Sequence, residues 1–171
     1  ELHAVEVIGT RVTPLPQAEA TLAAAELQAK STATSDTARL LDGIPGVSLY
    51  GAGGVSSLPS IRGLADDRLR IKVDGMELIS ACGNHMNPPL SYIDPSHVGK
   101  IEVFAGITPV SLGGDSLGGT IVVESEEFAF AGKDESMLTS GSAGAFYRSN
   151  GDAHGADISV ALAGEQFSLN Y

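Results

Sequence analysis

The sequence predicts an α+β module with a mixed β-sheet and short helices, followed by the first antiparallel strands of a transmembrane β-barrel. Three observations lead to this fold class. Segments with helical spacing of apolar residues precede Gly46, short β-type runs bounded by glycine extend from Val47 to about Phe130, and longer alternating segments begin beyond Lys133.

The composition favours an ordered chain and excludes a nucleic-acid partner. The 171 residues are 43% hydrophobic and 18% charged, with 10 Lys+Arg against 21 Asp+Glu and a formal net charge of −11. This balance is too apolar for intrinsic disorder, and it lacks the basic patch that binds phosphate backbones. Aromatic residues are scarce, with four Tyr, five Phe and no Trp. The chain therefore buries little apolar area per residue, and we expect that contact with a surrounding partner helps to stabilise it.

The first segment is predicted to be an extended arm. Residues Val5 to Val12 alternate and are β-rich, and Pro14 and Pro16 separate them from the rest of the chain. An arm of this kind can add a strand to the sheet edge of another chain.

Two helices are expected next. The Ala-rich segment from Ala18 to Lys30 predicts the first helix, which ends in a polar tract. A second, short helix begins after Ser35 or Asp36, either of which can cap it. Its apolar positions share one broad face: Ala38, Leu40, Leu41 and Ile44.

Short β-type runs bounded by Gly and Pro then predict the strands of a small sheet. The clearest run alternates Leu69, Ile71 and Val73 with basic residues and ends at an Asp-Gly turn, so one face is buried and one is solvated. The expected strands are Val47–Tyr50, Ser60–Arg62, Leu69–Val73, Ile101–Phe104 and Thr120–Val123.

The last segment has longer strands. Met137 to Arg148 and Ala156 to Ala163 flank Asn150-Gly151, a two-residue hairpin signal, and the alternation changes phase at a second tight turn after Ala163. About ten residues of alternation per strand is typical of a membrane β-barrel. Because the pattern runs up to Tyr171 with an open sheet edge, further strands are expected to complete the structure.

Five stretches, taken together and in this order, resemble the N-terminal plug of TonB-dependent outer-membrane receptors. They are Leu40-Leu41-Asp42-Gly43-Ile44-Pro45-Gly46-Val47, Ser60-Ile61-Arg62-Gly63, Val73-Asp74-Gly75-Met76, Lys100-Ile101-Glu102-Val103 and the Gly-rich stretch from Ser111 to Ile121. The resemblance implies an N-terminal arm (1–16), a plug domain (17–133) and the start of an outer-membrane barrel of about 22 strands (134–171).

The resemblance also implies partners. These are the chain's own barrel domain, the outer membrane of a bacterial cell, and TonB in the periplasm. A stretch that looks like the TonB box consists of Val5, Glu6, Val7, Ile8 and Gly9. Two positions depart from the family pattern: Lys100 replaces the usual Arg before Ile-Glu-Val, and a second Arg is missing near Ala105. Charge pairs that hold a plug to its barrel are therefore altered.

A copper site is expected in the segment from Ser80 to Pro89. Cys82 and Met86 are four residues apart, so one helical turn would place both sulfurs on one face. Two soft donors favour Cu(I), with Cu(II) as the alternative. The segment resembles a copper-handling subgroup of these receptors, in which Cys-x-x-x-Met is followed by Asn-Pro-Pro-Leu-Ser-Tyr. That resemblance implies Cys82 and Met86 as the plug's ligands, with further donors from the barrel; His85 is a third candidate donor.

Other interpretations stay open at this stage. Cys and Met four residues apart are commonly core packing residues. The receptor could instead carry a siderophore or another metal chelate, with Cys82 structural. A Gly-Asp-Ser-Leu sequence also spells an esterase nucleophile block at Ser116, but its expected His partner does not come after it in the chain, so we expect no enzyme activity.

Overall fold

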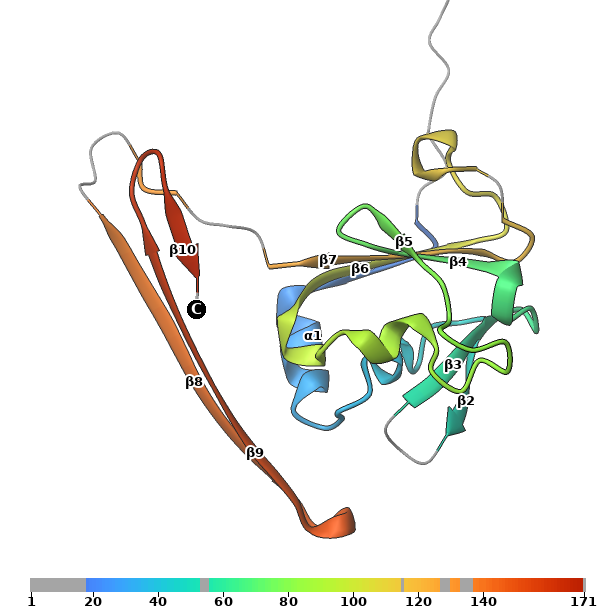
Figure 1. The fold of residues 1–171 in the computed structure, drawn as a ribbon, viewed down its shortest axis with the longest axis horizontal. Coiled ribbons are helices and arrows are strands. Elements are labelled where there is room, and N and C mark those ends of the chain that lie inside the picture. The colour runs from blue at the N-terminus through green and yellow to red at the C-terminus, as the bar shows by residue number, and fades with distance from the viewer. Residues whose placement is uncertain (1–17, 53–55, 115, 127–129, 133–136, 171) are drawn as a thin grey trace, which may run out of the picture.

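A computed structural model describes residues 18–52, 56–114, 116–126, 130–132 and 137–170 of the chain (Figure 1). Its body is a five-stranded mixed sheet in the order β1-β6-β7-β4-β5, in which only the β4–β7 pair is parallel. The strands are β1 (Ala20–Ala23), β4 (Leu69–Val73), β5 (Met76–Leu78), β6 (Val98–Ala105) and β7 (Gly119–Ser125). The mixed sheet predicted from the sequence is confirmed.

The described residues also form one α-helix and six short 3₁₀ helices. Helix α1 (Ala24–Ser31) packs against β6 and buries Leu27. The 3₁₀ helices are η1 (Thr37–Leu41), η2 (Asp66–Arg68), η3 (Pro89–Tyr92), η4 (Pro95–His97), η5 (Val110–Leu112) and η6 (Asn150–Asp152). In the part of the chain that the structure describes, no helix is both long and apolar enough to cross a membrane.

The first helix starts later than the sequence predicts. Residues 20–23 form the edge strand β1, paired antiparallel with β6, and the helix begins only at Ala24. The pairing buries Leu22 to 5% exposure in the core. Tertiary pairing therefore overrides the helix propensity of an Ala-rich segment. The second expected helix is η1, whose N-cap Asp36 accepts a hydrogen bond from the Ala38 N–H at 3.1 Å.

A two-stranded antiparallel sheet lies next to this body. Strands β2 (Val47–Ala52) and β3 (Ser56–Ile61) form it, and β3 packs against η1 and η3. The core joins the two sheets and the helices, and its largest fully buried apolar side chains are Leu27, Leu40, Leu41, Ile61, Leu90, Ile101 and Ile121. Leu90 comes directly after the candidate copper segment, which is therefore attached to the rigid part of the fold.

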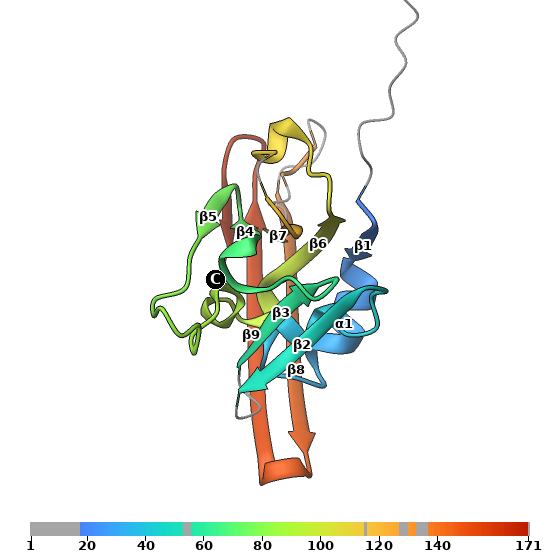
Figure 2. The same cartoon turned by 90° about the vertical axis from the view of Figure 1, so that its right-hand side faces the viewer.

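The C-terminal strands form a separate antiparallel sheet in the order β10-β9-β8. Strands β8 (Leu138–Arg148) and β9 (Ala153–Ala163) make a long ribbon beside the body, which extends past it in both views (Figures 1 and 2), and β10 (Ser168–Asn170) is the third strand. The expected hairpin is present, but its loop has four residues, because Arg148 pairs with Ala153. Gly151 supplies the left-handed backbone there, with φ 77°.

Candidate metal-binding loop

The predicted copper ligands lie in the loop between β5 and η3, which we call the sulfur loop (residues 80–88). The loop is a turn and not a helix: the His85 N–H donates to the Cys82 carbonyl at 3.0 Å. His85 has a left-handed φ of 50°, which ends any helical continuation. The expected helical turn is therefore wrong, since Gly83 and the Pro88-Pro89 pair favour a tight loop over a helix.

The turn nevertheless brings the two sulfur residues together. The backbone N–H of Met86 donates to the Sγ of Cys82 at 3.2 Å, in place of the carbonyl that a helix would use. The Met86 side chain is 64% exposed, and Cys82 is half-buried. Neither residue is sealed in the aliphatic core, so the fold does not use this pair as core packing.

The loop backbone favours the thiolate form of Cys82. The backbone N–H of Asn87, followed by that of Met86, lowers the pKa of the Cys82 thiol, and partial burial opposes this effect. The Asn84 N–H and the Ser80 hydroxyl lower this pKa further. Hydrogen bonds to a charged group stabilise it relative to the neutral form. The thiolate is the form of cysteine that binds metal ions, so these hydrogen bonds favour the form that a soft cation would need.

Two hydroxyl groups tie the ends of the sulfur loop together. The Ser80 Oγ lies 3.0 Å from the Cys82 carbonyl oxygen and 3.0 Å from that of Asn87. The Tyr92 hydroxyl accepts from the Ala81 N–H at 3.0 Å and donates to the Asn87 carbonyl at 3.1 Å. The spacing of Cys82 and Met86 could not predict the roles of Ser80 and Tyr92. Their hydroxyls bind backbone carbonyls, and the positions of these carbonyls depend on the course of the loop in the folded chain. The only signal was that Tyr92 ends the Asn-Pro-Pro-Leu-Ser-Tyr stretch and that Ser80 begins the segment in which the copper site was expected.

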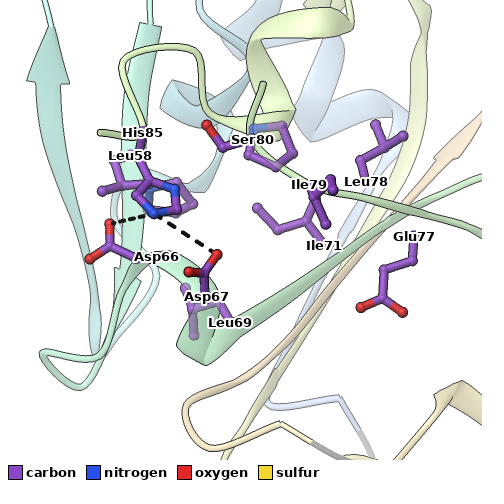
Figure 3. Close-up of a pocket in the computed structure, with 12 residues that line it drawn as sticks. Leu58, Asp66, Asp67, Leu69, Ile71, Glu77, Leu78, Ile79, Ser80 and His85 are labelled. Atoms are coloured by element: carbon purple, nitrogen blue, oxygen red, sulfur yellow. Dashed lines mark ion pairs between the residues drawn. The ribbon is translucent and has the colours of Figure 1, made fainter. Parts of the chain in front are cut away.

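The third candidate donor, His85, faces away from solvent toward two carboxylates. Its Nε2 lies 4.0 Å from the Asp66 Oδ1 and 3.9 Å from the Asp67 Oδ1, and its side chain is 15% exposed (Figure 3). The ring lines a cavity of about 150 Å³ together with Ser80 and apolar side chains such as Ile71. His85 therefore faces the carboxylates of η2, which lie within ion-pair distance of its Nε2 if the ring is protonated.

Within the described ranges, no group of three or more His, Cys, Asp or Glu side chains is arranged to hold a metal ion. Cys82 and Met86 are therefore a two-donor candidate. The TonB-box-like stretch from Val5 to Gly9 lies outside the described residues.

The Lys100 that departs from the family pattern has partners within its own sheet. Its Nζ lies 3.2 Å from Glu102 and 3.5 Å from Glu124. The Glu102 carboxylate contributes most to raising the pKa of Lys100, so the group is cationic throughout the neutral range.

The Ser116 hydroxyl lies in a cluster of hydroxyl groups. Its Oγ is 3.3 Å from the Thr108 hydroxyl and 3.4 Å from that of Thr120, and those two hydroxyls are 2.9 Å apart. A serine nucleophile needs a base such as His to take its proton. The described hydrogen-bond partners of Ser116 are only other hydroxyls, so these contacts do not support the esterase hypothesis.

Comparison with known families decides the affiliation. The model of the TonB-dependent receptor plug domain matches residues 11–120. The chain belongs to this plug-domain family. Both the receptor family that the motifs resemble and the expected fold class are confirmed. A comparison with curated proteins gives no match.

Solved structures of several receptors are similar to the plug and its hairpin. The copper transporter OprC is 28% identical, with a TM-score of 0.74, over 88% of this chain and 22% of that chain. The Serratia marcescens hemophore receptor HasR, in complex with its hemophore and heme, is 18% identical with a TM-score of 0.67, over 91% and 23%. The ferric enterobactin receptor PfeA is 19% identical with a TM-score of 0.61, over 93% and 24%.

The plug chain thus spans less than a quarter of the length of these receptors. Plug domains are non-enzymatic parts of transport proteins, and members of the receptor family are outer-membrane proteins. The similar structures include receptors for different cargoes, so their fold alone does not identify a cargo.

Proposed function

We propose that this chain is the plug of a TonB-dependent outer-membrane transporter that binds and imports copper ions. Cys82 and Met86 are its ligands, and copper is the cargo. The observation that carries the proposal is the geometry of the sulfur loop. The Met86 N–H donates to the Cys82 Sγ, and Met86 is 64% exposed. A thiolate and a thioether are soft donors, which favour Cu(I) over zinc or hard cations; Cu(II) is the alternative.

Two further observations support copper. Backbone N–H groups lower the pKa of the Cys82 thiol, which favours the ligand form. The similarity to a copper transporter, at 28% identity, is higher than the similarity to the enterobactin and hemophore receptors named above. His85 stays the third candidate donor of the proposed site, and its Nε2 faces Asp66 and Asp67 in this structure.

We also propose the domain organisation of an N-terminal arm (1–16), a plug (17–133) and the first barrel strands (134–171). The two faces of the β8–β9 ribbon support it. One face carries Tyr147, Ile158 and Val160, which are 68%, 73% and 44% exposed. The opposite face carries Arg148, whose Nη2 donates to the Ser35 hydroxyl of the plug at 3.0 Å. An apolar outer face and a polar face toward the plug are typical of barrel strands.

The arm and TonB complete the proposed mechanism. In this proposal the stretch from Val5 to Gly9 adds as a strand to TonB in the periplasm, and the energy of that coupling releases copper from the sulfur loop. Location in the outer membrane of a bacterial cell is part of the same proposal for the whole receptor.

Copper stoichiometry of the purified full-length receptor tests the proposal. We expect bound copper to fall strongly in both Cys82→Ala and Met86→Ala, because each variant removes one soft donor. Met76→Ala is the matched control, since Met76 is an equally exposed methionine (61%) on β5. Unchanged copper in both sulfur variants would remove the copper assignment and leave the receptor fold intact.

The second candidate is a receptor for a siderophore or another metal chelate. The structural likeness to the ferric enterobactin receptor and to HasR favours it, although both are below 20% identity. Chelates are recognised by their organic groups, so uptake of a chelate would not depend on the Cys82 thiol. Growth on ferric chelates that is lost without the receptor and restored by its Cys82→Ala variant would favour this candidate.

A further inference from the structure

The ends of the sulfur loop are joined at a neck of hydrogen bonds. Ala81 lies near the start of the loop and Asn87 near its end, and the Tyr92 hydroxyl bonds both: it accepts from the Ala81 N–H at 3.0 Å and donates to the Asn87 carbonyl at 3.1 Å. A phenol has one proton to donate and lone pairs to accept, so one hydroxyl satisfies both contacts.

Ser80 strengthens the same neck from the other side. Its Oγ lies 3.0 Å from both the Cys82 and the Asn87 carbonyl oxygens. Because Ser80 has a single hydroxyl proton, that proton is shared between these two carbonyls. The Asn87 carbonyl therefore accepts from the Tyr92 hydroxyl and shares the proton of Ser80 with the Cys82 carbonyl.

Tyr92 is itself attached to the rigid core. It ends the 3₁₀ helix η3, in which Pro89 is buried and Leu90 is fully buried. Both the N–H and the Oγ of Ser91 donate to the Pro88 carbonyl, at 2.9 and 2.7 Å, and these bonds fix the start of this helix. The Tyr92 hydroxyl therefore reaches the loop from a helix that is packed into the core, even though Tyr92 itself is 51% exposed.

We propose that Tyr92, together with Ser80, is a positioning residue of the copper loop. These hydroxyls hold the loop in its bound shape before the ion arrives, so that copper binding does not have to order the loop. The inference rests on the proposed function, because it assigns a role toward the same ion. A ligand that meets a preorganised site binds more tightly, since less conformational freedom is lost on binding.

Cu(I) affinity of the full-length receptor tests this role, measured by competition with a chromogenic Cu(I) chelator. We expect Tyr92→Phe to weaken Cu(I) binding by about tenfold, because it removes two hydrogen bonds from the neck. Ser80→Ala is expected to act in the same direction. The matched controls are Tyr50→Phe, an exposed tyrosine on β2, and Ser31→Ala, a half-buried serine at the end of α1 whose hydroxyl donates to the Gln28 carbonyl. Both controls should bind Cu(I) as the unmodified receptor does.

Hydrogen exchange separates positioning from a general loss of structure. In the metal-free Tyr92→Phe receptor, the amides of Ala81 and His85 should exchange faster while the melting temperature stays unchanged. Cu(I) should restore the protection of the His85 amide, because the ion then orders the turn that the phenol no longer holds. A purely structural role of Tyr92 would instead lower the melting temperature and leave the loop unprotected with copper bound.

The outcomes are distinct. If Cys82→Ala abolishes Cu(I) binding and Tyr92→Phe binds as the unmodified receptor does, the positioning role is overturned and the copper assignment stands. If Cys82→Ala binds Cu(I) unchanged, the proposed function fails and the positioning role fails with it.

Discussion

Gly119 offers a sharp test of how the plug sheet is built. It starts β7 between β6 and β4, with a φ of +134°, a conformation that is essentially restricted to glycine. A Cβ placed there would lie 2.1 Å from the Phe104 carbonyl oxygen and 3.1 Å from the Ala105 Cα. The two strands would have to separate to admit it. Gly119→Ala therefore combines backbone strain with a clash against a paired strand.

The expected cost comes from these two effects. The strained backbone costs about 1–3 kcal/mol, and each lost strand hydrogen bond costs about 1 kcal/mol. We therefore expect Gly119→Ala to lower the free energy of opening of the β6–β7 pair by about 3–5 kcal/mol. Gly75→Ala is the control for strain alone: Gly75 has φ +80° with no atom within 4 Å of its Cβ position, and we expect a cost of about 1 kcal/mol.

Native-state hydrogen exchange in the full-length receptor measures this free energy at the amides of β6 and β7. Gly83→Ala is a second control, since its backbone is not left-handed and its Cβ position is also open. It should leave β6 and β7 unchanged. Equal protection of the β6–β7 amides in Gly119→Ala and Gly75→Ala would refute the close approach of the strands on which the reasoning depends.

Three further predictions rest on local contacts. Because backbone N–H groups lower the pKa of the Cys82 thiol, alkylation of this thiol in the folded, metal-free receptor should reach half its maximal rate at a lower pH than in urea. In urea an ordinary thiol titrates at about 8.5, and identical pH profiles in the two states would contradict the prediction. Asp36→Ala should destabilise η1 by about 1 kcal/mol, seen as faster exchange of the Leu41 amide, since it removes the N-cap bond. Glu19→Gln should cost less than about 1 kcal/mol and less still in high salt, because its pair with Arg62 at 2.8 Å is exposed; a salt-independent loss would argue against an ion pair.

Local signals in the sequence predicted much of the fold. Alternation of Leu69, Ile71 and Val73 predicted β4 with its buried face, and Asp36 was one of two residues expected to cap η1. Both depend on residues next to each other along the chain. The predicted start of α1 was wrong because it depends on residues far apart in the chain. The pairing of Ala20 with Val103 outweighs the local helix propensity.

By itself, the sequence determined the family of this plug, most of its strands apart from β1 and β5, and the two sulfur residues with soft-donor chemistry. These are properties of residue types and their spacing. Only the tertiary structure decided that Cys82 and Met86 meet across a hydrogen-bonded turn, that His85 faces Asp66 and Asp67, and that Tyr92 ties the loop. Hydrogen bonds to backbone groups depend on the path of the chain, and that path is set by the packing of distant residues.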